Sequence, residues 1–112
     1  MSGISTHVLD TSKGLPAQGV RAVLARQSSA GHFFEIGGGI TDTNGRIEQV
    51  LDGGEQLEAG VYRLTFFTGE YLKGQESFYP EVAVLFEVRD PSRHHHVPLL
   101  LSPYGYTTYL GS

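Results

Sequence analysis

Short segments in which apolar side chains recur at every second position dominate this sequence, and turn-forming residues separate them. In residues 60–67, for example, Tyr62, Leu64 and Phe66 alternate with Val, Arg and Thr, and residues 18–27 alternate in the same way. A period of two is that of a β-strand, whose successive side chains point to opposite faces. About seven or eight such segments are typical of an antiparallel sandwich, so we expect a mainly β fold.

Turn and helix signals divide the rest of the chain. Further strands are expected near His7 and at residues 32–41, 47–51, 82–88 and 94–102. The Asn-Gly pair at 44–45 predicts a type I′ turn joining the strands on either side as a hairpin. The three glycines at 37–39 indicate a bulge or a close backbone approach. Residues 68–78 do not alternate, and we expect Thr68 to cap a short helix that Gly74 ends.

Length, charge and composition exclude several classes of protein. The chain has 112 residues, a formal net charge of −4 and no cysteine. This length predicts a single domain over residues 1–112. The acidic balance argues against nucleic-acid binding, and the absence of cysteine excludes disulfides and thiolate metal sites. The apolar runs are too short to span a bilayer and no signal peptide is visible. We therefore expect a cytoplasmic protein that does not bind membranes.

Five histidines in an acidic chain are the most unusual feature of the composition, and three of them are consecutive. On a strand, His94 and His96 point to one face and His95 to the other. A His-x-His pair can ligate zinc or copper, but it is also compatible with a polar or catalytic site, or with ordinary exposed residues. A third ligand could come from His7, His32 or a carboxylate, and no spacing rule selects one.

Other candidate residues are ambiguous when each is taken alone. His7 lies in the expected first strand, where a histidine is usually an ordinary hydrogen-bonded side chain. Arg46 follows the Asn-Gly turn and is either a solvated arginine or a fixed donor for a carbonyl or anionic oxygen. Tyr109 and the other tail tyrosines suit a core, an interface or a ligand contact. Ser112 has no nucleophile elbow around it, and the glycine run lacks a phosphate-loop lysine.

Four motifs in order resemble one family. They are Thr-His-Val-Leu-Asp at residues 6–10, Thr-Asp-Thr-Asn-Gly-Arg at 41–46, His-His-His-Val-Pro-Leu-Leu at 94–100 and the C-terminal segment 101–112. Together they look like the transthyretin-related 5-hydroxyisourate hydrolases, and the resemblance covers essentially the whole chain. It implies a transthyretin-like (prealbumin-like) antiparallel β-sandwich of two four-stranded sheets with one short helix. It also implies a homotetramer, a dimer of dimers, with active sites at the interface between the dimers.

The resemblance implies an activity and a set of site residues. Family members hydrolyse 5-hydroxyisourate to 2-oxo-4-hydroxy-4-carboxy-5-ureidoimidazoline in urate degradation, with no metal and no cofactor. The catalytic positions match His7, Arg46 and His96. The family tail Tyr-Arg-Gly-Ser matches a substrate-binding set of Tyr109, Leu110 and Ser112, with leucine standing in place of arginine.

A mechanism and two alternatives follow from these residues. One histidine of the His7–His96 pair would activate water while the other orients or donates, and Arg46 would stabilise the substrate oxygens. A first alternative is a non-catalytic, transthyretin-like carrier of small aromatic ligands, which Leu110 would favour by making the interface more apolar. A second alternative is a metal-dependent hydrolase that uses His94 and His96.

Overall fold

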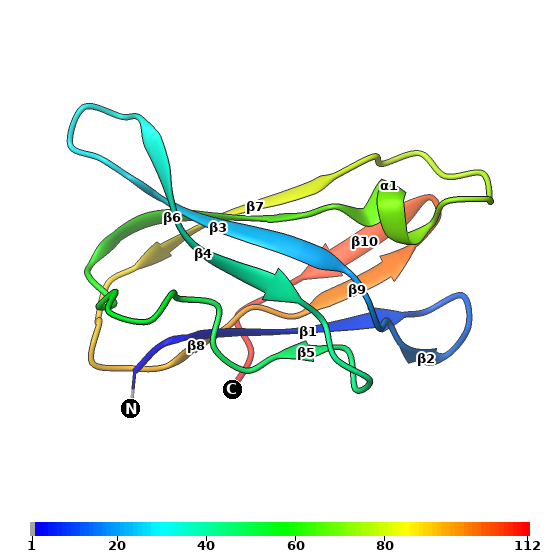
Figure 1. The fold of residues 1–112 in the computed structure, drawn as a ribbon, viewed down its shortest axis with the longest axis horizontal. Helices are drawn as coiled ribbons and strands as arrows, with labels where there is room; N and C mark the ends of the chain where they lie inside the picture. The colour runs from blue at the N-terminus through cyan, green and yellow to red at the C-terminus, as the bar shows by residue number, and fades with distance from the viewer. Residues whose placement is uncertain (1) are drawn as a thin grey trace.

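Two β-sheets face each other around an apolar interior, as expected for a sandwich (Figure 1). A computed structural model describes residues 2–112. One sheet has the strand order β4-β3-β6-β7, and every neighbouring pair in it is antiparallel. Its strands are β3 (Arg21–Gln27), β4 (Phe33–Ile40), β6 (Gly60–Phe66) and β7 (Val82–Val88). The predicted four-stranded antiparallel sheet is confirmed here.

The second sheet has six strands rather than four and is mixed rather than antiparallel. Its central strand is β1 (Ile4–Asp10), which pairs antiparallel with β2 (Leu15–Pro16) and β5 (Arg46–Ile47). The same strand pairs parallel with β8 (His95–His96) and β9 (Leu99–Ser102), and β10 (Gly105–Thr108) forms the edge. Four strands form the path β10-β9-β1-β2, and the two-residue strands β5 and β8 extend it.

The predicted hairpin around Asn44-Gly45 is wrong. A type I′ turn needs a positive φ at both central residues, here Asn44 and Gly45. Gly45 has a φ of 77°, but among residues 2–112 only glycines have a positive φ, so Asn44 does not and the turn is not type I′. The Asp42 carboxylate instead accepts hydrogen bonds from the backbone N–H groups of Asn44 (2.8 Å) and Arg46 (3.0 Å). This side-chain-supported turn sends the chain across to β1, and β5 ends at Ile47.

Two other elements are shorter than their sequence patterns predict. The helix α1 spans only Thr68–Tyr71, and Phe67 rather than Thr68 occupies its N-cap. The Thr68 hydroxyl donates to the Tyr79 carbonyl instead. The expected strand at 94–102 is divided into β8 and β9 around Pro98, which has no N–H to donate to a ladder. No helix among residues 2–112 is long and apolar enough to cross a membrane.

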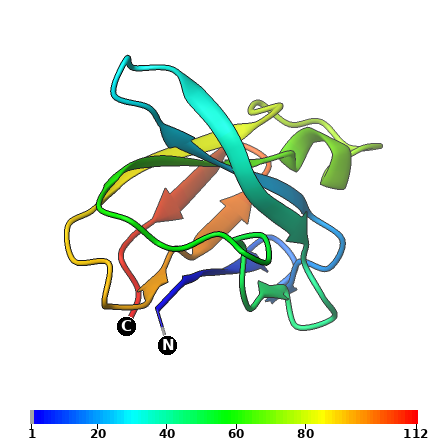
Figure 2. The same cartoon turned by 60° about the vertical axis from the view of Figure 1, so that its left-hand side comes forward.

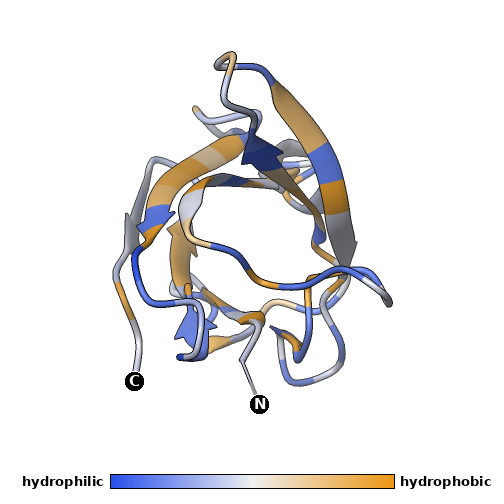
Figure 3. Ribbon diagram, turned by 90° about the vertical axis from the view of Figure 1, so that its left-hand side faces the viewer, coloured by the Kyte–Doolittle hydropathy of each residue, from blue (hydrophilic) through white to orange (hydrophobic). Residues whose placement is uncertain are grey.

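Side chains along β1 point alternately to the two faces of the sheet, and burial alternates with them from Thr6 to Asp10. Ile4, Thr6 and Val8 are at most 1% exposed and face the opposite sheet. Ser5 and His7, one position out of phase, therefore lie on the outer face. Each large apolar side chain buried in this way stabilises the fold by about 1.5–3 kcal/mol. Figure 2 shows the two sheets facing each other across the interior, and Figure 3, coloured by hydropathy, shows hydrophobic and hydrophilic residues alternating along a strand.

Candidate active site on the outer face of the six-stranded sheet

Strand β1 gathers the three predicted catalytic residues onto one face. His7 is directly opposite Arg46 in the antiparallel β1–β5 pair. Two residues earlier on the same face, Ser5 is paired with His96 in the parallel β1–β8 ladder. The outer face thus carries a group of His7, Arg46 and His96, which we call the His–Arg–His cluster. Residues far apart in sequence meet because β1 is the shared neighbour of two short strands.

Ser5 holds the imidazole of His96 in place. The Ser5 Oγ lies 2.8 Å from His96 Nδ1 and 2.7 Å from Nε2 of His94, with both contacts in hydrogen-bond range. Ser5 is only 8% exposed, whereas His94 is exposed and His96 is half-buried. His94 and His96 share a face, as the alternation predicts. Sequence reasoning missed Ser5, although its position two residues before His7 already placed both on the same face.

The electrostatic environment favours a neutral His96. Burial lowers the pKa of His96 below its ordinary value of 6.5, and the nearby charges of Arg46, His7 and His94 lower it further, while Glu48 opposes them. A neutral imidazole near pH 7 can accept a proton from water. None of the ion pairs formed within residues 2–112 involves Arg46, so its guanidinium is available to an oxygen of a substrate.

The C-terminal tail runs against His96. The Gly111 N–H donates to the His96 carbonyl at 2.8 Å, which forms an isolated β-bridge between the two residues. A Cβ at position 111 would lie 2.6 Å from His96 Cδ2, so any larger residue there would displace the ring or the tail. Ser112 follows immediately and is exposed. The predicted site residue Ser112 is therefore held one residue beyond the contact with His96.

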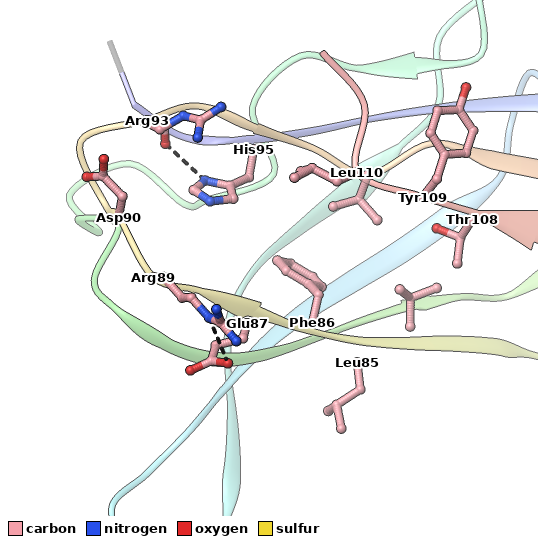
Figure 4. A pocket seen from close by; sticks show the side chains of 12 residues that line it. Leu85, Phe86, Glu87, Arg89, Asp90, Arg93, His95, Thr108, Tyr109 and Leu110 are labelled. Atoms are coloured by element: carbon pink, nitrogen blue, oxygen red, sulfur yellow. Dashed lines mark hydrogen bonds and ion pairs between the residues drawn. The ribbon is translucent and has the colours of Figure 1, made fainter.

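Tyr109 and Leu110 are not brought to the His–Arg–His cluster. They line a separate cavity of about 510 Å³ between β7 and the tail, together with Phe86 and His95 (Figure 4). Leu110 precedes the residue bridged to His96, and neighbouring residues of an extended chain point to opposite sides. Its side chain is 70% exposed. The substrate-binding role of Tyr109 and Leu110 stays a prediction.

The metal alternative finds no geometric support in the part of the chain described. Within residues 2–112, no group of three or more His, Cys, Asp or Glu side chains is arranged to hold a metal ion. His94 and His96 converge on the Ser5 hydroxyl. His32 lies exposed between β3 and β4, and the ring of His95 contacts the Arg93 carbonyl at 2.9 Å.

A mixed six-stranded sheet packed on an antiparallel four-stranded one places this protein in the transthyretin-like class. The family model described as "HIUase/Transthyretin family" matches residues 4–111, and the chain belongs to that family.

Proteins named 5-hydroxyisourate hydrolase and proteins named transthyretin both occur among its relatives. The chain is 46% identical to the mouse 5-hydroxyisourate hydrolase, over 99% of this chain and 96% of the mouse protein. The structure of the Klebsiella pneumoniae 5-hydroxyisourate hydrolase matches with a TM-score of 0.85 and 36% identity, covering 100% of both chains. Sea bream transthyretin in complex with thyroxine matches with a TM-score of 0.89 and 33% identity, over 96% of this chain and 93% of that one.

Proposed function

We propose that this protein hydrolyses 5-hydroxyisourate to 2-oxo-4-hydroxy-4-carboxy-5-ureidoimidazoline in urate degradation. The observation that carries the proposal is the His–Arg–His cluster, whose members come from three different strands and share the outer face of one sheet. Relatives named 5-hydroxyisourate hydrolase at 46% and 36% identity over nearly the whole chain support the same activity.

The chemistry follows from the residue types. Water adds to the ring carbonyl carbon, and the imidazole Nε2 of His96 takes its proton as the C–O bond forms. Arg46 holds the carbonyl oxygen and stabilises the negative charge that develops on it. The C–N bond then breaks, and the ring nitrogen receives the proton. His7, opposite Arg46, orients the substrate or donates to it. Neither a metal nor an organic cofactor enters these steps.

The assembly that we propose is a homotetramer, a dimer of dimers, built from one domain per chain over residues 1–112. The sites would lie at the interface between dimers, where the outer faces of two six-stranded sheets meet. In that assembly, Tyr109, Leu110 and Ser112 would contact substrate in a site that neighbouring chains complete. We expect the protein to act in the cytoplasm.

Alanine substitutions test the proposal directly. We expect His7→Ala, Arg46→Ala and His96→Ala each to lower kcat/KM by about 10²-fold or more, the range typical of acid–base and oxyanion-stabilising groups. The assay follows the loss of freshly prepared 5-hydroxyisourate by ultraviolet absorbance. His32→Ala, in the exposed loop between β3 and β4, is the matched histidine control. Wild-type rates in all three folded variants would refute the proposed function.

A non-catalytic carrier is the second candidate. The observation that favours it is the match to a transthyretin that binds thyroxine, at 33% identity over 96% of this chain. The charged and polar cluster is less suited to a purely apolar ligand than to the oxygen-rich ring of an oxidised purine. Calorimetry with thyroxine separates the two candidates. Tight binding without any turnover of 5-hydroxyisourate would reverse their order.

A further inference from the structure

One serine hydroxyl joins two imidazole rings at the edge of the cluster. Ser5 Oγ contacts His96 Nδ1 at 2.8 Å and His94 Nε2 at 2.7 Å. A hydroxyl has a single proton, so it donates to one ring nitrogen and accepts from the other. Two arrangements of equal geometry exist. Either Nδ1–H of His96 donates to Ser5 and Ser5 donates to His94, or both bonds are reversed.

Strand pairing fixes this three-residue unit. The His95 N–H donates to the Gly3 carbonyl at 2.8 Å, and the Val97 N–H donates to the Ser5 carbonyl at 2.9 Å. These backbone bonds lie on both sides of His96, so the short distances from Ser5 Oγ do not depend on long, mobile side chains. On the opposite edge of the His96 ring, Gly111 lies against Cδ2. Nε2 is the remaining nitrogen, and no hydrogen bond within residues 2–112 engages it.

We propose that Ser5 and His94 form a proton relay for His96. This inference rests on the proposed function. When Nε2 of His96 takes the proton of the attacking water, Nδ1 passes its own proton to Ser5 Oγ. Ser5 in turn passes its proton to His94 Nε2. His96 ends neutral in its other tautomer, and the positive charge resides on His94. When Nε2–H is given to the leaving ring nitrogen, the two transfers reverse and all three residues return to their starting state.

The surroundings of the two histidines explain why the transfer is useful. His96 is half-buried beside Arg46 and His7, which disfavour a positive charge there, and Glu48 compensates only in part. His94 is exposed, so water solvates the charge that it receives. Moving the charge outward leaves Arg46 as the cation that faces the developing oxyanion. Ser5 and His94 are thus positioning residues that act through His96.

Substitutions separate proton transfer from simple support of the ring. We expect Ser5→Ala and His94→Gln each to lower kcat by about 10- to 100-fold and to change KM less than twofold. This loss in kcat is smaller than the loss expected on removing a general base itself. Glutamine keeps a hydrogen-bonding partner for Ser5 but carries no titratable proton. Ser5→Thr restores the hydroxyl and is expected to restore kcat. His32→Gln replaces the exposed histidine between β3 and β4 and is expected to behave as wild type. Full kcat in His94→Gln overturns the relay.

A second measurement does not require turnover. Nitrogen-15 NMR of the imidazoles reports which ring nitrogen of each histidine carries a proton and which accepts a hydrogen bond. In the wild-type protein we expect His96 Nδ1 and His94 Nε2 both to be hydrogen-bonded to Ser5, and His94→Gln to change the tautomer balance of His96. In Ser5→Ala the His96 spectrum should no longer respond to His94→Gln. A His96 spectrum that His94→Gln leaves unchanged when Ser5 is present overturns the relay. The expected response in a protein that does not consume 5-hydroxyisourate overturns the proposed function alone.

Discussion

Replacing Gly111 with alanine should inactivate the protein while leaving it folded. The backbone at Gly111 is outside the left-handed region, so alanine introduces no backbone strain there. The added Cβ would lie 2.6 Å from Cδ2 and 3.3 Å from Cγ of His96. Ordinary carbon–carbon contact is about 3.5–4.0 Å, so the ring or the tail must move by about 1 Å.

The size of the expected effect follows from that displacement. The His96 ring is held at Nδ1 by Ser5 and must align Nε2 with water. A displacement of about 1 Å in a reacting group costs about 10²-fold in rate, or about 2.7 kcal/mol of transition-state stabilisation. Stability should change by less than about 0.5 kcal/mol, because a single bridge joins Gly111 to His96 and the tail lies outside the apolar core.

Two variants make the experiment decisive. Gly111→Ala and Gly105→Ala are compared for kcat/KM on 5-hydroxyisourate and for thermal unfolding. Gly105 is the matched control, because a Cβ there would lie 3.7 Å from Ser102 Oγ, an ordinary contact. We expect a large loss of activity in the first variant and none in the second. If Gly111→Ala keeps wild-type kcat/KM, the tail does not fix the position of His96 and the reasoning fails.

Two further predictions concern Leu110 and pH. Leu110→Arg should raise kcat/KM on 5-hydroxyisourate by about tenfold, because in the proposed tetramer position 110 contacts substrate and a guanidinium there can donate hydrogen bonds to its oxygens. An unchanged kcat/KM would show that the side chain stays in the cavity beside β7 and does not contact substrate. The free energy of unfolding should fall as pH falls below about 6.5, because burial lowers the pKa of His96 and the unfolded chain takes up that proton at a higher pH. Urea unfolding at several pH values checks this, and His96→Gln should flatten the dependence.

Local patterns in the sequence predict the strands well where one face of each is buried. The segments that became β3, β6 and β7 alternate with a period of two and lie within two or three residues of their predicted limits. They alternate because side chains on one face must leave water while those on the other remain solvated. The hairpin predicted from the Asn-Gly pair was wrong because the Asp42 side chain determines the turn: its carboxylate accepts a hydrogen bond from the N–H of Arg46.

The candidate site could be predicted only in part. The motifs pointed to His7, Arg46 and His96, and the structure brings these three together. Nothing in the motifs indicated that Ser5 contacts two histidines or that Gly111 lies on the ring of His96. Such contacts depend on the register between strands.

The sequence by itself determined the mainly β sandwich, the shared face of His94 and His96, and the residue types available for hydrolysis. Only the tertiary structure decided that β1 is the shared neighbour of β5 and β8, and so which side chains touch. Ser5 and His96 are 91 residues apart in the chain. Periodicity is a local property that reports which face of a segment is buried. Pairing over such a distance is set by the packing of the whole core, and a shift of one residue would turn every one of these side chains to the other face.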